Sequence, residues 1–227
     1  MLPADDEQRS PTSQRIAAAL RAGVCPTDES FDAFLPSDLR EVSSQFWTPL
    51  VVAMRVARWL DGLGVRSVVD IGSGPGKLCV AGALAGNATF TGLEHRARFV
   101  TAARSLAATF DIEERVSFVQ GALGETELPR ADAYYLYNPF GENLFGTEDH
   151  LDADVELGHD RYERDVAAAE SLFDSAPEGT IVVTYNGFGG RIPAEYGEIR
   201  VNRHLPSVLR MWKKGVGTDP RVGGVRP

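Results

Sequence analysis

The sequence predicts an α/β protein with a parallel sheet. Between residues 67 and 185, short apolar runs rich in β-branched residues alternate with longer segments of helical periodicity. This βαβα order implies a parallel sheet with right-handed crossover connections. The chain has 227 residues, of which 43% are hydrophobic, which is enough for one such domain and a small N-terminal extension.

Composition narrows the cellular context and the partners. The formal net charge of −9 argues against a protein that grips long duplex nucleic acid, so nucleic acid is an unlikely partner. No apolar run approaches the roughly 20 residues of a membrane span, and the acidic N-terminus does not resemble a secretion signal. Cys25 and Cys79 are the only cysteines, and Cys79 lies in an apolar helical pattern typical of a core position. We therefore expect a cytoplasmic protein without membrane contact.

Residues 1–46 are expected to form a helical extension that covers part of the main domain. A short helix is predicted over 13–22, with Gly23 as its end. The segment 31–47 reads as a mixed connector with several apolar residues, which suits a cover over the sheet or over a ligand site.

A strong amphipathic helix is predicted over 48–63, at the start of the main domain. Thr48 suits the N-cap and Pro49 the first helical position. Gly64 suits the end of the helix.

The main domain is predicted to span residues 47–216, followed by a C-terminal tail at 217–227. Its expected strands are 67–71, 88–94, 116–120, 133–138 and 180–185. Its expected helices are 77–84, 97–110 and 164–175. Two further apolar runs, 198–203 and 208–212, suggest a closing antiparallel hairpin.

The most informative segment is a glycine-rich turn directly after the first strand. Asp70 ends the strand, and Gly72, Gly74 and Gly76 follow at every second position. Glycines let the backbone approach a ligand closely, and the next helix offers free N–H groups at its start. Turns of this kind bind nucleotides. The dinucleotide fingerprint requires its third glycine at the position that Lys77 occupies here.

The run from Asp70 to Gly76 resembles motif I of class I S-adenosylmethionine (SAM) methyltransferases, D/E-x-G-x-G-x-G, at every position. The resemblance covers about residues 46–214. It implies a doubly wound, mostly parallel sheet of seven strands in the order 3-2-1-4-5-7-6, with helices on both faces. It also implies SAM as cofactor, with contacts from Asp70, Gly72, Ser73, Gly74 and Gly76.

Two later strand ends complete the expected cofactor site. Glu94 ends the second strand, where an acid accepts hydrogen bonds from ribose hydroxyls, although a solvated loop glutamate is the alternative. His95 is placed either beside the adenine or on the surface. After the third strand, the family often carries an acid that meets the adenine amino group, and Ala122 stands there instead. Backbone groups of Gly121, Ala122 and Leu123 are then expected to read the adenine.

The segment Phe46-Trp47-Thr48-Pro49 resembles an element of amino-methylating enzymes that precedes motif I. In that arrangement the threonine contacts the methionine end of the cofactor, which assigns this role to Thr48. A helix N-cap explains the same residue, and the two roles are compatible. The two aromatic residues fit the core or a pocket lid.

The fourth strand ends in Tyr137-Asn138-Pro139-Phe140, which resembles the D/N-P-P-Y/F motif of amino methyltransferases with one proline fewer. The resemblance makes Asn138 a hydrogen-bond acceptor for the substrate N–H, Pro139 a carbonyl acceptor, and Phe140 a ring that packs on the substrate. Asn138 would also adjoin the cofactor. The single Asn with an aromatic resembles Dot1-like and uncharacterised bacterial methyltransferases. An ordinary turn after a strand is the alternative.

The chemistry of this strand end depends on the acceptor atom. Direct displacement at a sulfonium mainly needs alignment and the exclusion of water. An oxygen or carbon acid also needs a general base, for which Tyr137, His150 and His159 are candidates.

The connection 142–165 is long and strongly acidic, with Arg161 and Arg164 as its only basic residues apart from histidine. A connection of this length is often an active-site lid, and its field would attract a cation. The substrate is then an amine-bearing protein or small molecule that is cationic. Solubility alone explains the same acidity.

The sequence therefore predicts an enzyme that transfers a methyl group from SAM to a nitrogen. A nicotinamide-dependent oxidoreductase is one alternative, against which the glycine spacing and the lack of a Tyr-x-x-x-Lys pair both argue. A catalytically silent SAM-binding protein is another. Neither a CxxC pair nor a His/Asp cluster is present, so no metal site is expected.

Overall fold

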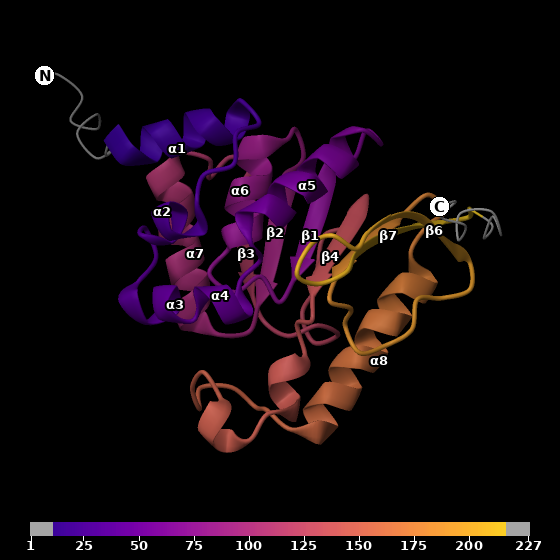
Figure 1. Cartoon of the computed structure of the whole chain (residues 1–227). Coiled ribbons are helices and arrows are strands. Elements are labelled where there is room, and N and C mark those ends of the chain that lie inside the picture. Colours follow the sequence, from indigo (N-terminus) through magenta and orange to yellow (C-terminus); the bar gives the residue numbers. More distant parts are fainter. Residues whose placement is uncertain (1–10, 217–227) are drawn as a thin grey trace, which may run out of the picture. The chain divides into compact units, whose positions relative to one another are not determined.

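The computed structural model describes residues 11–216 of the chain. The strands form a seven-stranded sheet in the order β3-β2-β1-β4-β5-β7-β6, which confirms the predicted fold class (Figure 1). The chain divides after Gln120 into two compact units. We call the described parts of these units the N-terminal unit (residues 11–120) and the C-terminal unit (residues 121–216). The predicted tail at 217–227 lies outside the described residues.

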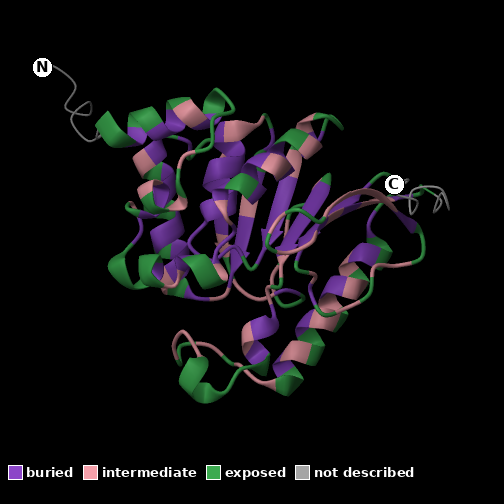
Figure 2. Ribbon diagram, viewed as in Figure 1, coloured by how far each residue is buried: buried purple, intermediate pink, exposed green. Residues whose placement is uncertain are grey.

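The N-terminal unit contains three parallel strands. They are β1 (Ser67–Ile71), β2 (Thr89–Glu94) and β3 (Val116–Gln120). The register pairs Asp70 with Gly92, and Gly92 with Phe118. Burial falls from β1 to β3 (Figure 2): β1 is buried except for Ser67, whereas Thr89 of β2 and Ser117 and Gln120 of β3 are exposed.

Two helices follow the first two strands at the predicted places. They are α6 (Lys77–Ala85) and α7 (Ala97–Phe110). Apart from its last residue, α6 is buried along its whole length, which its apolar sequence Leu-Cys-Val-Ala-Gly-Ala-Leu explains. Gly82 in this helix faces Phe90 of β2, whose ring leaves no room for a Cβ.

The described part of the predicted N-terminal extension, residues 11–46, contributes four helices to this unit. They are α1 (Pro11–Arg21), α2 (Asp28–Asp32), α3 (Ser37–Glu41) and α4 (Ser43–Phe46). The predicted mixed connector is thus three short helices, held by side chains rather than by their own length. Phe31 stacks on Phe110 of α7 with ring centroids 5.0 Å apart, and Leu39 is buried.

The helix α5 (Leu50–Asp61) begins later than predicted, and Thr48 is not its N-cap. Pro49 occupies the N-cap position, and its side chain makes no capping hydrogen bond. The backbone N–H of Leu50 instead donates to Asp28 Oδ1 at 2.9 Å. A carboxylate from α2 therefore caps α5, because it lies close enough to take the place of a local hydroxyl.

The C-terminal unit contains the other four strands. They are β4 (Ala133–Tyr137), β5 (Ile181–Tyr185), β6 (Tyr196–Asn202) and β7 (Leu209–Lys214). The pair β4–β5 is parallel, whereas β5–β7 and β6–β7 are antiparallel. This confirms the predicted closing hairpin, with each of its strands two residues longer at one end than expected.

One long helix, α8 (His159–Ser175), packs in this unit. Phe173 on α8 lies against Tyr134 of β4 and Tyr196 of β6, with ring centroids 6.2 and 6.5 Å away. The buried ammonium of Lys214 donates to three carbonyls at the C-terminal end of α8, those of Phe173, Asp174 and Ala176. A cation at this end neutralises the partial negative charge of the helix dipole.

Two connections in the C-terminal unit differ from the regular alternation. The acidic connection after β4 contains two short 3₁₀ helices, η1 (Gly141–Leu144) and η2 (Thr147–Asp149), before α8 begins at residue 159. Residues 186–195, between β5 and β6, form a loop instead of a helix. None of the helices within residues 11–216 is long and apolar enough to cross a bilayer.

Candidate functional site

The glycine turn of the N-terminal unit has the backbone geometry that its sequence predicts. Gly72, Gly74 and Gly76 all adopt positive φ angles, of 74°, 54° and 78°. The N–H groups of Gly72 and Ser73 both donate to the carbonyl of Leu93 at 2.9 Å. The turn is thereby attached to the end of β2, and Gly76 forms the N-cap of α6. Such left-handed residues favour glycine strongly.

Packing makes two of these glycines obligatory. A Cβ on Gly74 would lie 2.7 Å from the Trp47 ring, and a Cβ on Gly76 would lie 2.6 Å from the Phe118 ring. Trp47 is itself fixed, since its indole N–H donates to the Leu39 carbonyl at 2.8 Å. Of the two predicted settings for Trp47, core or lid, the structure places it in the buried core, directly against the turn.

Glu94 connects the end of β2 to the same turn. Its Oε2 accepts a hydrogen bond from the Gly74 N–H at 3.0 Å, and its Oε1 accepts from the Arg96 N–H at 2.8 Å. The side chain is buried, with a residue exposure of 5%. These two backbone bonds orient the Glu94 carboxylate at the end of β2. His95 lies beside it, with Nε2 at 3.0 Å from Arg96 Nη1.

Asp70 is a buried carboxyl group at the end of β1. The thiol of Cys79 donates to its Oδ2 at 3.4 Å. Burial is the main reason that the pKa of Asp70 is raised to about 7. The hydrogen bond from Cys79 lowers this pKa, and the negative charge of Glu94 raises it further. Burial likewise raises the pKa of Cys79, which stays a thiol at neutral pH. Asp70 is therefore poised to ionise when a cation approaches.

One polar atom of the turn has no partner within residues 11–216. Ser73 Oγ is buried and makes no hydrogen bond there. A buried hydroxyl without a partner is uncommon in folded proteins and marks a place where a ligand or water completes the site.

An ionic cluster that was not predicted from the sequence surrounds Lys77, directly after the turn. Lys77, only 2% exposed, contacts Asp32 Oδ1 at 2.8 Å and Asp28 Oδ1 at 2.6 Å. Its ammonium also donates to Asp32 Oδ2 at 2.9 Å and to Ser43 Oγ at 3.2 Å. Ser43 in turn donates to Asp32 at 2.6 Å. These contacts attach α2 and α4 to the first residue of α6.

One signal in the sequence could have indicated this cluster, namely a lysine at the start of an otherwise apolar helix. A buried ammonium needs acidic partners, because its desolvation is otherwise very unfavourable. The partners lie more than 40 residues earlier in the chain, so spacing alone did not identify them. Thr48, which follows Trp47, is buried as well. Its predicted contact with the cofactor stays a prediction.

The residues predicted to read the adenine begin the C-terminal unit. A Cβ on Gly121, whose φ is 155°, would overlap the hydroxyl of Thr126. The carbonyl of Ala122 accepts from the Glu125 N–H at 3.2 Å in a turn, and Leu123 is buried. The predicted role of these backbone groups remains open to experiment.

The end of β4 contains a backbone bend at Asn138, whose φ is 39°. Its N–H donates to the Gly187 carbonyl at 3.0 Å, and its carbonyl accepts from the Gly141 N–H at 3.2 Å. Asn138 is exposed and Pro139 half-buried, whereas Phe140 is buried. Of the three residues predicted to meet the substrate, Asn138 is thus the most exposed, and Phe140 is buried.

Tyr137 precedes this bend and is partly buried. Its ring centroid lies 4.7 Å from that of Tyr185 at the end of β5. Burial, and to a lesser extent the neighbouring Tyr185, raise the pKa of Tyr137 above its ordinary value. Tyr137 therefore keeps its proton at neutral pH and acts as a hydrogen-bond donor rather than as a base.

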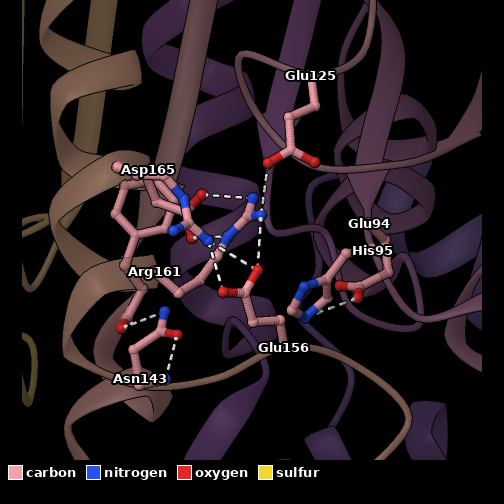
Figure 3. A network of polar contacts seen from close by, with 10 residues as sticks. Glu94, His95, Glu125, Asn143, Glu156, Arg161 and Asp165 are labelled. Atoms are coloured by element: carbon pink, nitrogen blue, oxygen red, sulfur yellow. Dashed lines mark hydrogen bonds and ion pairs between the residues drawn. The ribbon is translucent and has the colours of Figure 1, made fainter.

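Basic side chains neutralise part of the acidic connection (Figure 3). Arg161 forms a two-point contact with Asp165, at 2.7 and 3.1 Å, and also contacts Glu125 at 2.6 Å. Arg164 makes two bonds of 2.7 Å to Glu156. These bonds hold the pKa of Arg161 above its ordinary range and that of Glu156 below it.

The start of the connection is tied down as well. Asn143 is buried, donates to the Phe140 carbonyl at 3.1 Å, and accepts from the Gly158 N–H at 3.2 Å (Figure 3). The N–H of Leu151 donates to Glu142 Oε1 at 2.8 Å. The connection is thereby closed at both ends. No group of three or more His, Cys, Asp or Glu suited to a metal ion is present among the described residues.

Comparisons with known proteins agree on the fold. No protein-family model matches the sequence, and no curated protein matches it. Solved structures do match. An RNA methyltransferase from Salinibacter ruber in complex with S-adenosyl-L-homocysteine is 23% identical and has a TM-score of 0.54; the match covers 74% of this chain and 92% of that one.

Two further solved structures extend the likeness over nearly the whole chain. An O-methyltransferase from Bacillus cereus in complex with SAH is 13% identical, with a TM-score of 0.57 and coverage of 92% of this chain and 99% of that one. The mitomycin 7-O-methyltransferase is 16% identical, with a TM-score of 0.53 and coverage of 90% and 69%. The chain therefore has the fold of the class I SAM-dependent methyltransferases.

Proposed function

We propose that the protein is a SAM-dependent methyltransferase and that its acceptor is a nitrogen atom. The observation that carries the proposal is the glycine turn together with Glu94, whose carboxylate is held at the end of β2 by the Gly74 and Arg96 N–H groups. A nucleoside at this place would offer its ribose hydroxyls to Glu94. The fold supports the same assignment.

The residues around the turn suit SAM in charge as well as in shape. SAM supplies an electrophilic methyl group on a positively charged sulfur. The buried carboxyl of Asp70, with its pKa near 7, is a suitable counter-charge for a cationic ligand. The hydroxyl of Ser73 supplies a buried polar group that still lacks a partner within residues 11–216.

The end of β4 favours a neutral amine as the acceptor. The Asn138 side-chain oxygen and the Pro139 carbonyl accept hydrogen bonds without adding charge, so they orient an N–H group and leave the nitrogen lone pair free. Transfer to an oxygen acid requires a general base. Tyr137 with its raised pKa does not suit that role, which leaves His150 and His159 of the predicted candidates. The exposed carboxylates of the acidic connection, which include Asp149 and Asp154, favour a cationic protein or small molecule.

An oxygen acceptor is the second candidate, since two of the fold neighbours are O-methyltransferases. The RNA methyltransferase among the neighbours raises RNA as a substrate as well. The net charge of −9 opposes a long RNA, because phosphate binding needs clustered basic side chains. Cytoplasmic location belongs to the same proposal.

The cofactor is tested first, by thermal unfolding with SAM, S-adenosylhomocysteine and NAD in parallel. At about 100 times its dissociation constant a ligand adds about 2.7 kcal/mol of stability. For a domain of this size that raises the Tm by roughly 5–11 °C. We expect the increase with the two sulfur nucleosides only. An increase with NAD alone would overturn the proposal.

The acceptor is tested with SAM carrying a labelled methyl group and a panel of amines, phenols and short RNAs. We expect label in the amines, and about 100-fold lower turnover in Asn138→Ala with unchanged SAM affinity. Asn202→Ala, an exchange of the same type in β6, serves as the control. Equal turnover in wild type and Asn138→Ala would remove Asn138 from the mechanism, and label in phenols alone would move the acceptor to oxygen.

A further inference from the structure

A hollow lies wholly within the C-terminal unit, beside the loop that replaces a helix between β5 and β6. Its volume is about 300 Å³. The side chains that line it include Asn186, Phe188, Ile192, Val208, Arg210 and Trp212. Cavities that bind small molecules range from about 300 to 1,000 Å³, so this one suits a ligand of one or two rings.

The strand β7 forms the floor of this pocket. Arg210 pairs with Thr184 and Trp212 with Val182 across the β5–β7 ladder. Residues two apart on a strand point to the same face, so Arg210 and Trp212 lie side by side on the floor. Both side chains are only partly buried, which leaves part of the Trp212 ring available to a ligand.

The loop after β5 forms a preformed wall. Gly187 and Gly189 have φ angles of 72° and 87°. Phe188 between them is buried and packs edge-on against Phe173 of α8, with ring centroids 5.5 Å apart. The N–H of Arg191 donates to Glu170 Oε1 on α8 at 2.7 Å. The loop is therefore fixed to α8 on both sides of the pocket wall.

Arg210 and Trp212 place hydrogen-bond donors on the floor of the pocket, and Thr184 and Asn186 in its lining can donate or accept. Arg210 forms an ion pair with Glu198 of β6 through Nη1. A guanidinium carries five N–H donors, so that pair leaves several of them for a ligand. The indole N–H of Trp212 is a further donor, and an indole has no acceptor. A pocket with this inventory selects a ligand that brings acceptors.

We propose that this pocket binds a planar aromatic carboxylate. The ring lies on Trp212 between the apolar side chains of Phe188, Ile192 and Val208, and the carboxylate accepts from Arg210. Glu198 carries the opposite charge, but Arg210 lines the pocket and Glu198 does not, so a bound carboxylate would meet the guanidinium. The inference concerns binding alone and does not depend on the proposed methyl transfer.

The wall of the pocket is bonded to the candidate acceptor site. Gly187, which lines the pocket, accepts the hydrogen bond of the Asn138 N–H. Occupancy of the pocket is therefore expected to influence the position of the β4 end.

Calorimetry on the full chain without SAM tests the proposal with three probes. They are 2-naphthoate, 2-naphthylmethylamine, which has the same ring and the opposite charge, and cyclohexanecarboxylate, which has the charge without a planar ring. We expect 2-naphthoate to bind at least about tenfold more tightly than either of the others. Equal binding of the amine would overturn the assignment of a carboxylate, and equal binding of the saturated acid would overturn that of a planar ring.

Variants locate the binding. Trp212→Leu and Arg210→Met are each expected to weaken 2-naphthoate about tenfold or more. Arg191→Met is the matched control, because Arg191 is highly exposed and does not line the pocket. If Trp212→Leu does not fold, Val208→Phe fills the same pocket from another side. Unchanged binding in the folded variants would overturn the proposal.

An NMR measurement on the wild-type chain requires no stable variant. The chain has three tryptophans, so an ¹⁵N-labelled sample gives three indole N–H signals. Trp212→Leu, or otherwise Trp47→Phe and Trp59→Phe by elimination, assigns the Trp212 signal. We expect 2-naphthoate to shift that signal and leave the other two in place. A shift confined to Trp47 or Trp59 would show binding elsewhere and contradict the inference.

Discussion

The glycine turn and the end of β4 are both sharp bends after a parallel strand, and they are held in different ways. At the turn, backbone hydrogen bonds, two aromatic rings and the Lys77 cluster restrict the same few residues. At the end of β4, Asn138 is exposed and held mainly through its backbone. Several independent contacts restrain the conformation of the first bend, whereas the second is restrained mainly through its backbone and its Asn138 side chain can vary. A cofactor is constant and a substrate is not, and this difference in restraint suits that division.

The largest difference between the two bends is expected from the Lys77 cluster. Lys77→Ala leaves Asp28 and Asp32 without their buried cation, and breaking such a pair lowers the free energy of unfolding by about 3–5 kcal/mol. Urea unfolding measures this change. Arg40→Ala, at an exposed position of the same segment, is the control and is expected to change the free energy by less than about 0.5 kcal/mol. Similar losses in both variants would show that the cluster adds little.

The buried carboxyl of Asp70 makes the stability of the protein depend on pH. Its pKa is about 7 in the folded protein, against an ordinary value of 3.8. A raised folded pKa contributes stability below pH 3.8 that is lost as the pH rises to 7, and the loss amounts to roughly 4 kcal/mol at 1.36 kcal/mol per pH unit.

Comparison with Asp70→Asn isolates this contribution from the other titrating groups. We expect the unfolding free energy of the wild type to fall relative to that of Asp70→Asn as the pH rises from 4 to 7. Chemical unfolding at a series of pH values measures it. A constant difference across that range would mean that Asp70 ionises normally.

A matched pair of glycine substitutions compares the two regions directly. Gly76 and Gly187 have nearly equal φ angles, 78° and 72°. A Cβ at Gly76 would lie 2.6 Å from Phe118, and a Cβ at Gly187 would meet nothing within 4 Å. We expect Gly187→Ala to lower stability by about 1–2 kcal/mol through backbone strain alone, and Gly76→Ala by about 1–3 kcal/mol more. Equal losses would contradict the steric account of the turn.

The smallest effect is expected at Asn138, whose φ of 39° suits asparagine or glycine. Asn138→Gly is expected to change the free energy of unfolding by less than about 1 kcal/mol, because glycine relieves the strain while it loosens the unfolded chain. Thermal unfolding measures this. A larger loss would show that the Asn138 side chain stabilises the bend, which would then be more restrained than we describe.

The N-terminal unit shows how much the sequence predicts when the pattern is local. The strands 67–71 and 116–120 and the helix 97–110 begin and end at the predicted residues. Alternating glycines after an acid identified the turn, because that geometry depends on neighbours in the chain. Thr48 shows the limit, since its predicted capping role passed to Asp28, a residue 22 positions before Leu50.

What the sequence did not reveal depends on contacts between distant segments. The pairing of Lys77 with Asp32, the neutralisation of Glu156 by Arg164, and the pocket around Trp212 all require the folded chain. From the sequence, Trp212 was predicted only as a residue of the closing strand 208–212. Trp212 is partly exposed beside residues 186–195, which form a loop. No pattern in the sequence predicted the absence of a helix in that segment.

The Lys77 cluster also dictates an order of events during synthesis. The acids Asp28 and Asp32 leave the ribosome well before the lysine that they bind, which lies 45 residues after Asp32. Until then α2 is a five-residue segment, too short to be stable as an isolated helix. Closing the loop of 45 residues between Asp32 and Lys77 has an entropic penalty before any contact compensates for it. The N-terminal segment is therefore expected to remain open on the nascent chain and to dock only once the first strand and the start of α6 are in place.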